Sequence, residues 1–184
     1  MSTMANEAAA AGVAQALRRV EAVLQRRPEV GEHDDAPAVA RWQSGTRVVS
    51  SHANGTQIES DMPAEFGGSG TRITPGWLLR AGFASCSATV IAMHAAVEGI
   101  ELDLLEAQAS SRSDSRGVFG MADTDGMPVS AGPHDVRLDV RIAARGVDAQ
   151  RLRTLVERSI NCSPMGCAMR EAVPVQLRID VTSD

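Results

Sequence analysis

Three cysteines are the side chains of this sequence best suited to covalent chemistry. Cys86, Cys162 and Cys167 lie in a chain of 184 residues, and no two of them form a C-x-x-C pair. An odd number without such a pair fits neither a disulfide framework nor a zinc site of familiar spacing. In a reducing compartment, thiols of this kind stay free unless they react. We therefore expect no metal and no cofactor, and we consider each thiol as a nucleophile.

Cys86 lies within a run of small residues, Ala81-Gly-Phe-Ala-Ser-Cys-Ser-Ala-Thr-Val90. Small neighbours allow another backbone or a substrate to approach the sulfur closely. A cysteine in such a place is often only a small buried hydrophobic residue, and composition alone favours that interpretation. Because an apolar helix face disfavours a thiolate, a reactive Cys86 requires a nearby cation.

Cys162 directly precedes Ser163-Pro164, which has the sequence of a helix start. Free amides at such a start favour an anion, so local sequence favours a thiolate at Cys162 more than at the other two cysteines. Cys167 follows five residues later, which on one helix corresponds to about 140° of rotation. We therefore expect the two sulfurs to face different partners, with Cys167 filling space in the core or at the surface.

A histidine beside Cys86 would indicate a Cys-His hydrolase. His94 is eight residues away on the same expected helix, about 12 Å along its axis, and cannot reach that sulfur within one chain. We expect it to be a hydrogen-bonded core histidine. The other histidines, His33, His52 and His134, lie in linker or turn segments, where nothing ties them to a thiol or a metal.

Composition excludes several classes of protein. A formal net charge of −5 and an aromatic content of 3% disfavour binding to nucleic-acid backbones or stacked bases. The hydrophobic content of 43% is sufficient for one core, and 184 residues fit one domain with an extension. The first residues show no secretory signal pattern, so we expect a cytoplasmic protein.

The N-terminal part is predicted to be an extension, residues 1–36, followed by the main domain, residues 37–184. Val13, Leu17, Val20 and Leu24 have helical spacing between Ala5 and about Arg27, and a linker follows to residue 36. Two short strand-like runs, 42–50 and 56–60, are joined through Asn54-Gly55, a favoured hairpin dipeptide. The glycine-rich segment 66–70 lacks the spacing of a phosphate-binding loop and is expected to be a flexible connection.

Thr74-Pro75 predicts the start of a long helix that runs to Glu98. Only Arg80, His94 and Glu98 carry or readily gain charge within it, so it should be buried in a core. A membrane span is the competing interpretation, but the run is dominated by small residues and no second hydrophobic span is nearby.

The second half alternates between strands and helices. Strands are predicted at 102–111, at 136–142 and, last, from Val175 to Val181, where apolar residues alternate with polar ones. Asp148 is expected to cap a helix, and Ser163-Pro164 to begin another. Strands interrupted by a buried helix indicate an α+β fold rather than a doubly wound parallel sheet.

The run Ile73-Thr-Pro-Gly-Trp-Leu-Leu-Arg-Ala-Gly-Phe-Ala-Ser-Cys86 resembles the OsmC/Ohr family of osmotically inducible and organic hydroperoxide resistance proteins. Phe66-Gly67-Gly68 precedes it and Glu98-Gly99-Ile100-Glu101-Leu102 follows it in the order that the family has. The resemblance extends to Cys162-Ser163-Pro164 and covers about residues 37–181.

The resemblance implies a fold and a reaction. The fold is an intertwined homodimer in which a long buried central helix packs between β-sheets. In the reaction, a helix cysteine attacks the peroxide, an arginine holds it as thiolate, a glutamate orients that arginine, and a second cysteine resolves the sulfenic acid. Carried over, Cys86 matches the attacking residue and Cys162 is the resolving one. Arg47 is our candidate for the arginine, with Arg41 as the alternative.

Two positions depart from the family pattern. Gly76 stands ten residues before Cys86, where the family has its glutamate, and Ser163 separates Cys162 from the proline that the resolving cysteine usually adjoins. We predict thiol-dependent reduction of small hydrophobic organic hydroperoxides, with a dithiol reductant, as antioxidant stress defence. The alternative is a non-enzymatic stress or ligand-binding protein of the same fold. A thiol-dependent hydrolase ranks third.

Overall fold

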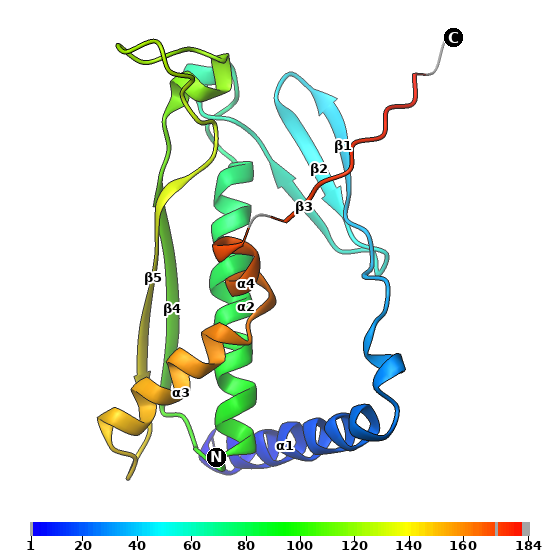
Figure 1. Cartoon of the computed structure of the whole chain (residues 1–184), viewed down its shortest axis with the longest axis vertical. Coiled ribbons are helices and arrows are strands. Elements are labelled where there is room, and N and C mark those ends of the chain that lie inside the picture. The colour runs from blue at the N-terminus through cyan, green and yellow to red at the C-terminus, as the bar shows by residue number, and fades with distance from the viewer. Residues whose placement is uncertain (1, 172, 182–184) are drawn as a thin grey trace.

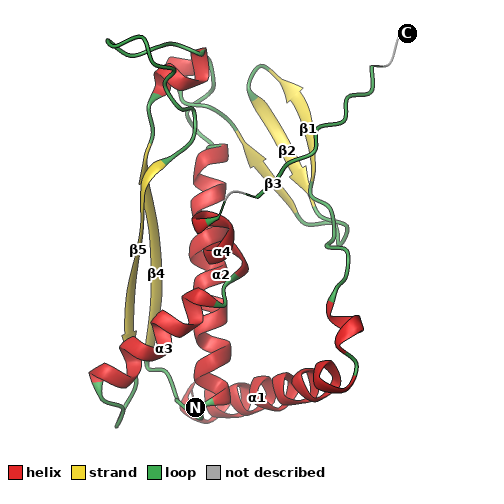
Figure 2. Cartoon of the chain, viewed as in Figure 1, coloured by secondary structure: helices red, strands yellow, loops and turns green. Residues whose placement is uncertain are grey.

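The computed structural model describes residues 2–171 and 173–181. Helices and antiparallel strands combine in one α+β architecture, which confirms the predicted class (Figures 1 and 2). With η marking short 3-10 helices, the elements are α1 (Ser2–Arg26), η1 (Pro28–Gly31), β1 (Val39–Ser44), β2 (Arg47–Ser51), β3 (Gln57–Ser60), η2 (Ala64–Phe66), α2 (Pro75–Val97), β4 (Leu104–Arg112), η3 (Ser115–Phe119), β5 (His134–Ala143), α3 (Ala149–Asn161) and α4 (Pro164–Arg170).

The central element is α2, which begins where the sequence predicts. Thr74 accepts a hydrogen bond from the amide of Trp77 at 3.2 Å, and Pro75 takes the first helical position. The helix packs against β4, α3 and α4, and α1 lies across its C-terminal end (Figure 1). Its buried residues recur every fourth position on one face: Phe83, Ser87, Ile91 and Ala95. One face of α2 is therefore covered by its own chain.

Length and composition alone would allow α2 to cross a membrane. Only 17% of its most apolar stretch is buried inside this chain, and α2 packs against β4, α3 and α4.

The strands form two antiparallel sheets, β1-β2-β3 and β4-β5. The first sheet corrects the sequence prediction, because the run 42–50 is not one strand. Gly45, with φ of 54°, lets the chain reverse between β1 and β2, so three strands form instead of two. The predicted turn is confirmed at Asn54-Gly55, between β2 and β3, where Gly55 has φ of 90°. In the second sheet, the register shifts between Ser110 and Arg112 at the end of β4.

A small core joins the C-terminal end of α2 to α3. Ala95, Ile100, Leu152 and Leu155 are buried together. The side chain of Asp148 accepts the amide of Arg151 at 2.9 Å and caps α3, as predicted. This core fixes the first half of α3 against the C-terminal end of α2.

The predicted last strand is wrong for this single chain. Residues 173–181 form no strand, and Val175, Leu177, Ile179 and Val181 are between 74% and 89% exposed. A strand needs a hydrogen-bonded neighbour, and neither sheet includes this segment, which crosses the β1-β2-β3 sheet in the view of Figure 1. The alternating pattern is present, but the described residues of 173–181 pair with no strand.

Candidate functional site

Two segments that are 77 residues apart in sequence meet at Cys86. The Cys86 Sγ lies 3.3 Å from the Oγ of Ser163. Cys86 is half-buried on α2, whereas Ser163 is fully buried as the N-cap of α4 and accepts the Gly166 amide at 3.3 Å. Either the thiol or the hydroxyl can donate in this contact. A thiolate at Cys86 has no proton of its own, so it would accept the proton of the Ser163 hydroxyl.

Gly166 permits the close approach that places Ser163. A Cβ atom at Gly166 would lie 2.6 Å from the carbonyl oxygen of Ile160 and 3.2 Å from the Cβ of Ser163. Both distances are shorter than ordinary contacts. Only glycine therefore fits at this turn, in which α4 folds back against the end of α3.

Cys162 lies beside this contact but does not make it. It is the C-cap of α3 and is exposed, while the next residue, Ser163, faces Cys86. Cys167 is half-buried, with its sulfur 3.5 Å from the carbonyl oxygen of Asn161 and 3.5 Å from Nη2 of Arg170.

One continuous helix through Cys162 and Cys167, the premise of the 140° rotation, is wrong, whereas the expectation that the two sulfurs face different partners stays a prediction. Helix α3 ends at Asn161 and α4 begins at Pro164, so the angle between these two residues is not that of a single helix. The Cys167 thiol instead reaches back to the carbonyl group that precedes Cys162.

Arg47 begins β2 and Arg41 lies in β1, so both candidate arginines belong to the three-stranded sheet. Both are exposed. No hydrogen bond or ion pair among the residues described joins either of them to Cys86. Their role at the thiol stays a prediction.

The turn before Arg47 is tied to the glycine-rich segment by Asp61. Its carboxylate accepts the Thr46 hydroxyl at 2.5 Å and the amides of Met62 and Ser69 at 2.8 Å. These hydrogen bonds, that of Thr46 first, hold the pKa of Asp61 well below its ordinary value. A Cβ at Gly68 would overlap the backbone of Met62. The segment 66–70 is therefore folded onto Asp61 and is not the flexible connection that was expected.

His94 is a hydrogen-bonded histidine near the far end of α2, as predicted. Its Nδ1 lies 3.0 Å from the Oγ of Ser159, which donates to the carbonyl of Leu155 at 2.6 Å. Because that hydroxyl proton is already used, Nδ1 carries the hydrogen toward Ser159. Burial, and then the positive charge of Arg158, lower the pKa of His94, while Glu98 opposes them.

Arg80 has no expected role from the sequence. Among the residues whose burial the structure describes, it is the only arginine that is not exposed. Its Nη1 lies 3.4 Å from the Oγ of Ser111. A pocket beside it is lined by Leu79, Arg80, Phe83, Ser111, Pro133, Val136 and Met169. The pocket is small, about 10 Å³, and Cys86 does not line it, although Phe83 comes one helical turn before Cys86 on α2. The sequence feature that could have identified Arg80 is a single arginine within an otherwise apolar helix.

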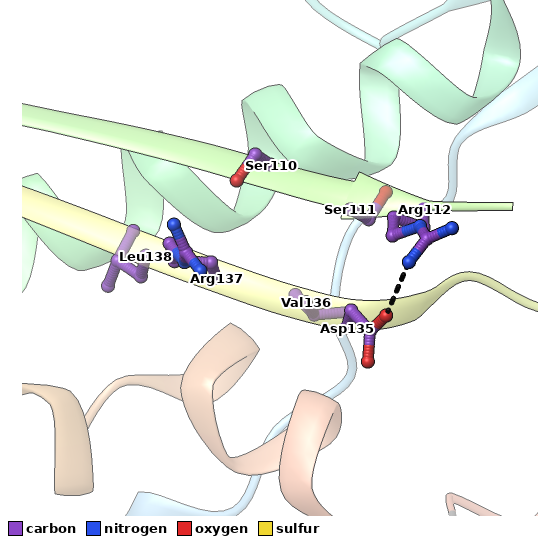
Figure 3. Close-up of a pocket in the computed structure, with 7 residues that line it drawn as sticks. All are labelled: Ser110, Ser111, Arg112, Asp135, Val136, Arg137 and Leu138. Atoms are coloured by element: carbon purple, nitrogen blue, oxygen red, sulfur yellow. Dashed lines mark ion pairs between the residues drawn. The ribbon is translucent and has the colours of Figure 1, made fainter.

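Ser111 also borders a broad open hollow on the β4-β5 sheet, shown in Figure 3. There Arg112 forms an ion pair with Asp135 over 3.7 Å. Asp135 has φ of 50°, which is unusual for a residue other than glycine, and it faces the register shift in β4. Irregularities of this kind change the direction in which side chains point at the end of a strand.

Comparisons with known proteins agree with this architecture. The sequence profile of the OsmC-like protein family matches residues 68–178. An OsmC-like protein from Mycoplasma pneumoniae has a similar structure, with a TM-score of 0.63 and 14% identity over 77% of this chain and 91% of that chain. No curated protein matches the sequence significantly.

Two further solved structures are organic hydroperoxide resistance proteins. The protein from Elizabethkingia anophelis has a TM-score of 0.55 and 17% identity over 77% of this chain and 91% of that one. The protein from Legionella pneumophila has a TM-score of 0.51 and 20% identity over 75% and 92%. Identities this low show a shared fold, whereas the profile covers more than half of the chain. The chain belongs to the OsmC-like protein family.

Proposed function

We propose that this protein reduces organic hydroperoxides and that the thiol of Cys86 is the attacking group. The observation that carries the proposal is the contact of 3.3 Å between Cys86 Sγ and the buried Ser163 hydroxyl. This contact gives a half-buried thiol a fixed hydrogen-bond donor. The fold is shared with proteins that are named for hydroperoxide resistance, which supports the same chemistry.

The reaction has two steps. The Cys86 thiolate attacks the peroxide, so that an S–O bond forms, the O–O bond breaks and the alcohol leaves with a proton. The resulting sulfenic acid is then attacked by a second thiol, which forms a disulfide and releases water. A dithiol reductant returns both cysteines to thiols by exchange.

Cys162 is our candidate for the second thiol, and Arg47 for the cation that holds the thiolate. Cys162 is exposed and directly precedes the residue that contacts Cys86. The α3–α4 junction must therefore rotate before the two sulfurs can bond. Arg47 is fixed to the main domain through Thr46 and Asp61. Its guanidinium would approach the thiol in a homodimer, in which sheets of one chain pack near the helix of the other.

The expected substrates are small hydrophobic hydroperoxides, and the expected compartment is the reducing cytoplasm. Apolar side chains of α2 precede Cys86 along the helix, among them Leu79 and Phe83, and they favour an apolar substrate. A reducing compartment would supply the dithiol that completes the cycle.

The test is an assay of cumene hydroperoxide consumption with a dithiol reductant. Wild type and Cys167→Ser should consume peroxide at similar rates, whereas Cys86→Ser should lose nearly all activity. Equal and negligible rates for wild type and Cys86→Ser would favour the second candidate, a binding protein without redox chemistry. Gly76, at the position of the family's glutamate, favours that candidate.

A further inference from the structure

Asp61 is the one charged side chain that is buried among the residues whose burial the structure describes, with 3% of its surface exposed. Burial of a carboxylate costs free energy unless hydrogen bonds replace the water around it. Here three donors do so, the Thr46 hydroxyl at 2.5 Å and the amides of Met62 and Ser69 at 2.8 Å. The carboxylate is therefore held in one place by three residues.

Asp61 also joins the turn between β1 and β2 to the start of α2. Its backbone amide donates to the carbonyl oxygen of Ile73 at 3.0 Å. Ile73 directly precedes Thr74, which is the N-cap of α2. The carboxylate and the amide of one residue thus connect the turn that contains Thr46 to the helix that carries Cys86.

Arg47 depends on this connection for its position. It directly follows Thr46 at the start of β2, its side chain is exposed, and none of the described residues forms an ion pair or a side-chain hydrogen bond with it. Thr46 is half-buried, and its hydroxyl donates to Asp61. The place of the guanidinium is therefore set by the backbone of the turn, which Thr46 anchors to Asp61.

We propose that Asp61 and Thr46 are positioning residues for the reduction of hydroperoxides, because they fix the turn that carries Arg47 relative to α2. The proposal rests on the proposed function, in which Arg47 holds the Cys86 thiolate. Neither positioning residue touches the peroxide or exchanges a proton. Their contribution is the placement of a guanidinium, whose N–H donors have a fixed geometry. In the predicted homodimer α2 lies at the interface, so a turn that is fixed to α2 is also fixed relative to the thiol of either chain.

Thr46→Val tests the proposal, because it keeps the shape of the side chain and removes the donor. The folded variant should be oxidised at Cys86 by cumene hydroperoxide about tenfold more slowly than wild type, since a small displacement of a positioning group can cost up to about a hundredfold in rate. Thr46→Ser keeps the hydroxyl and should keep the rate. Thr56→Val makes the same change in the turn between β2 and β3, where Thr56 is exposed, and should react as wild type does. Quenched-flow mixing, alkylation and mass spectrometry measure the rate, and urea titration shows that each variant is folded.

The Arg47→Gln background shows whether the hydroxyl acts through the arginine. Arg47→Gln alone should slow the oxidation of Cys86 at least as much as Thr46→Val does. Thr46→Val should add no further loss in this background, because changes to residues that act in one chain of contacts are not additive. If Thr46→Val does not fold, Thr46→Ala, which leaves room for a water beside the carboxylate, takes its place with the same expected results.

Equal oxidation rates for wild type and Thr46→Val would overturn the positioning role and leave the proposed function intact. So would Thr46→Ser or Thr56→Val as slow as Thr46→Val, or an equal loss from Thr46→Val with and without Arg47→Gln. A wild-type Cys86 that does not react with the peroxide would overturn the proposed function, and the positioning role with it.

Discussion

The side chain of Ser163 takes part in two contacts. Its Oγ caps α4 by accepting the Gly166 amide, and it also lies against the Cys86 sulfur. Ser163→Ala removes both, so the free energy of unfolding should fall by about 1 kcal/mol from the lost cap. The rate of Cys86 alkylation at neutral pH should fall as well, because the thiolate loses a donor. Urea titration and timed alkylation with iodoacetamide measure the two effects.

Asp148→Ala is the matched control for this prediction. It removes the cap of α3, an equivalent hydrogen bond to the amide of Arg151, without touching Cys86. Its stability should fall by a similar amount while alkylation of Cys86 stays at the wild-type rate. Equal alkylation rates in Ser163→Ala and Asp148→Ala would show that the serine hydroxyl does not assist the thiol.

His94 should make the stability of the fold depend on pH. Burial lowers the pKa of His94 in the folded chain, while in the unfolded chain it keeps its ordinary value of about 6.5. As pH falls, the unfolded chain therefore takes up the proton first, and the stabilising contribution, which is full above about pH 6.5, is lost below it. His94→Gln should flatten the decrease in unfolding free energy between about pH 7 and pH 5. Urea titrations at several pH values measure that slope.

His33→Gln serves as the control, because His33 is exposed. His33→Gln should show the same dependence of the unfolding free energy on pH as the wild type. A slope in His94→Gln as steep as that of wild type would contradict the assigned environment of His94.

The sequence singles out the reactive groups better than it predicts their partners. Cys86 stood out by its small neighbours, and Ser163 by the Ser-Pro helix start. That these two would meet could not be predicted, because local patterns carry no information about a contact across 77 residues. The sequence analysis did not identify the contact of Arg80 for the same reason, since its hydrogen bond to Ser111 depends on the packing of α2 against β4.

The α3–α4 junction is the element most sensitive to added volume. A Cβ at Gly166 would lie 2.6 Å from the carbonyl oxygen of Ile160, so Gly166→Ala must shift the backbone. Such overpacking should lower the unfolding free energy by roughly 1–3 kcal/mol and disturb the position of Ser163. Gly12→Ala, in open space on α1, should instead be neutral or raise it by up to about 1 kcal/mol. Urea titration compares them, and equal stability of the two variants would contradict the packing.

Helix boundaries were the part of the fold most accessible from sequence. Thr74, Asp148 and Ser163 each accept the amide three residues later, as their residue types indicate. Turns were harder to predict from the sequence. The reversal at Gly45 was missed because apolar and β-branched residues continue on both sides of it, whereas Asn54-Gly55 has the composition of a favoured hairpin.

The exposed apolar surface of the chain is where we expect the predicted homodimer to form its interface. Only one face of α2 is buried, although the helix has apolar residues nearly all round. The C-terminal segment also exposes an alternating apolar row, Val175, Leu177, Ile179 and Val181. Surfaces of this kind are typical of interfaces between subunits. The predicted homodimer would cover α2 and offer the terminal segment a strand to pair with.

If dimerisation and folding are coupled, the thermal midpoint should rise with protein concentration, because association stabilises only the folded chain. Differential scanning fluorimetry over a dilution series, together with analytical ultracentrifugation, measures this. A stable monomer with a midpoint that does not change on dilution would remove the dimer and any site that combines residues of two chains.

The central claim is that Cys86 is the thiol that attacks a hydroperoxide. Its most direct test is mass spectrometry of the reduced protein after one equivalent of cumene hydroperoxide, followed by alkylation and proteolysis. The account predicts oxidation at Cys86, recovered as a disulfide with Cys162, or as the trapped sulfenic acid in Cys162→Ser, with Cys167 still alkylated. Cys86 recovered fully alkylated and unmodified would contradict it.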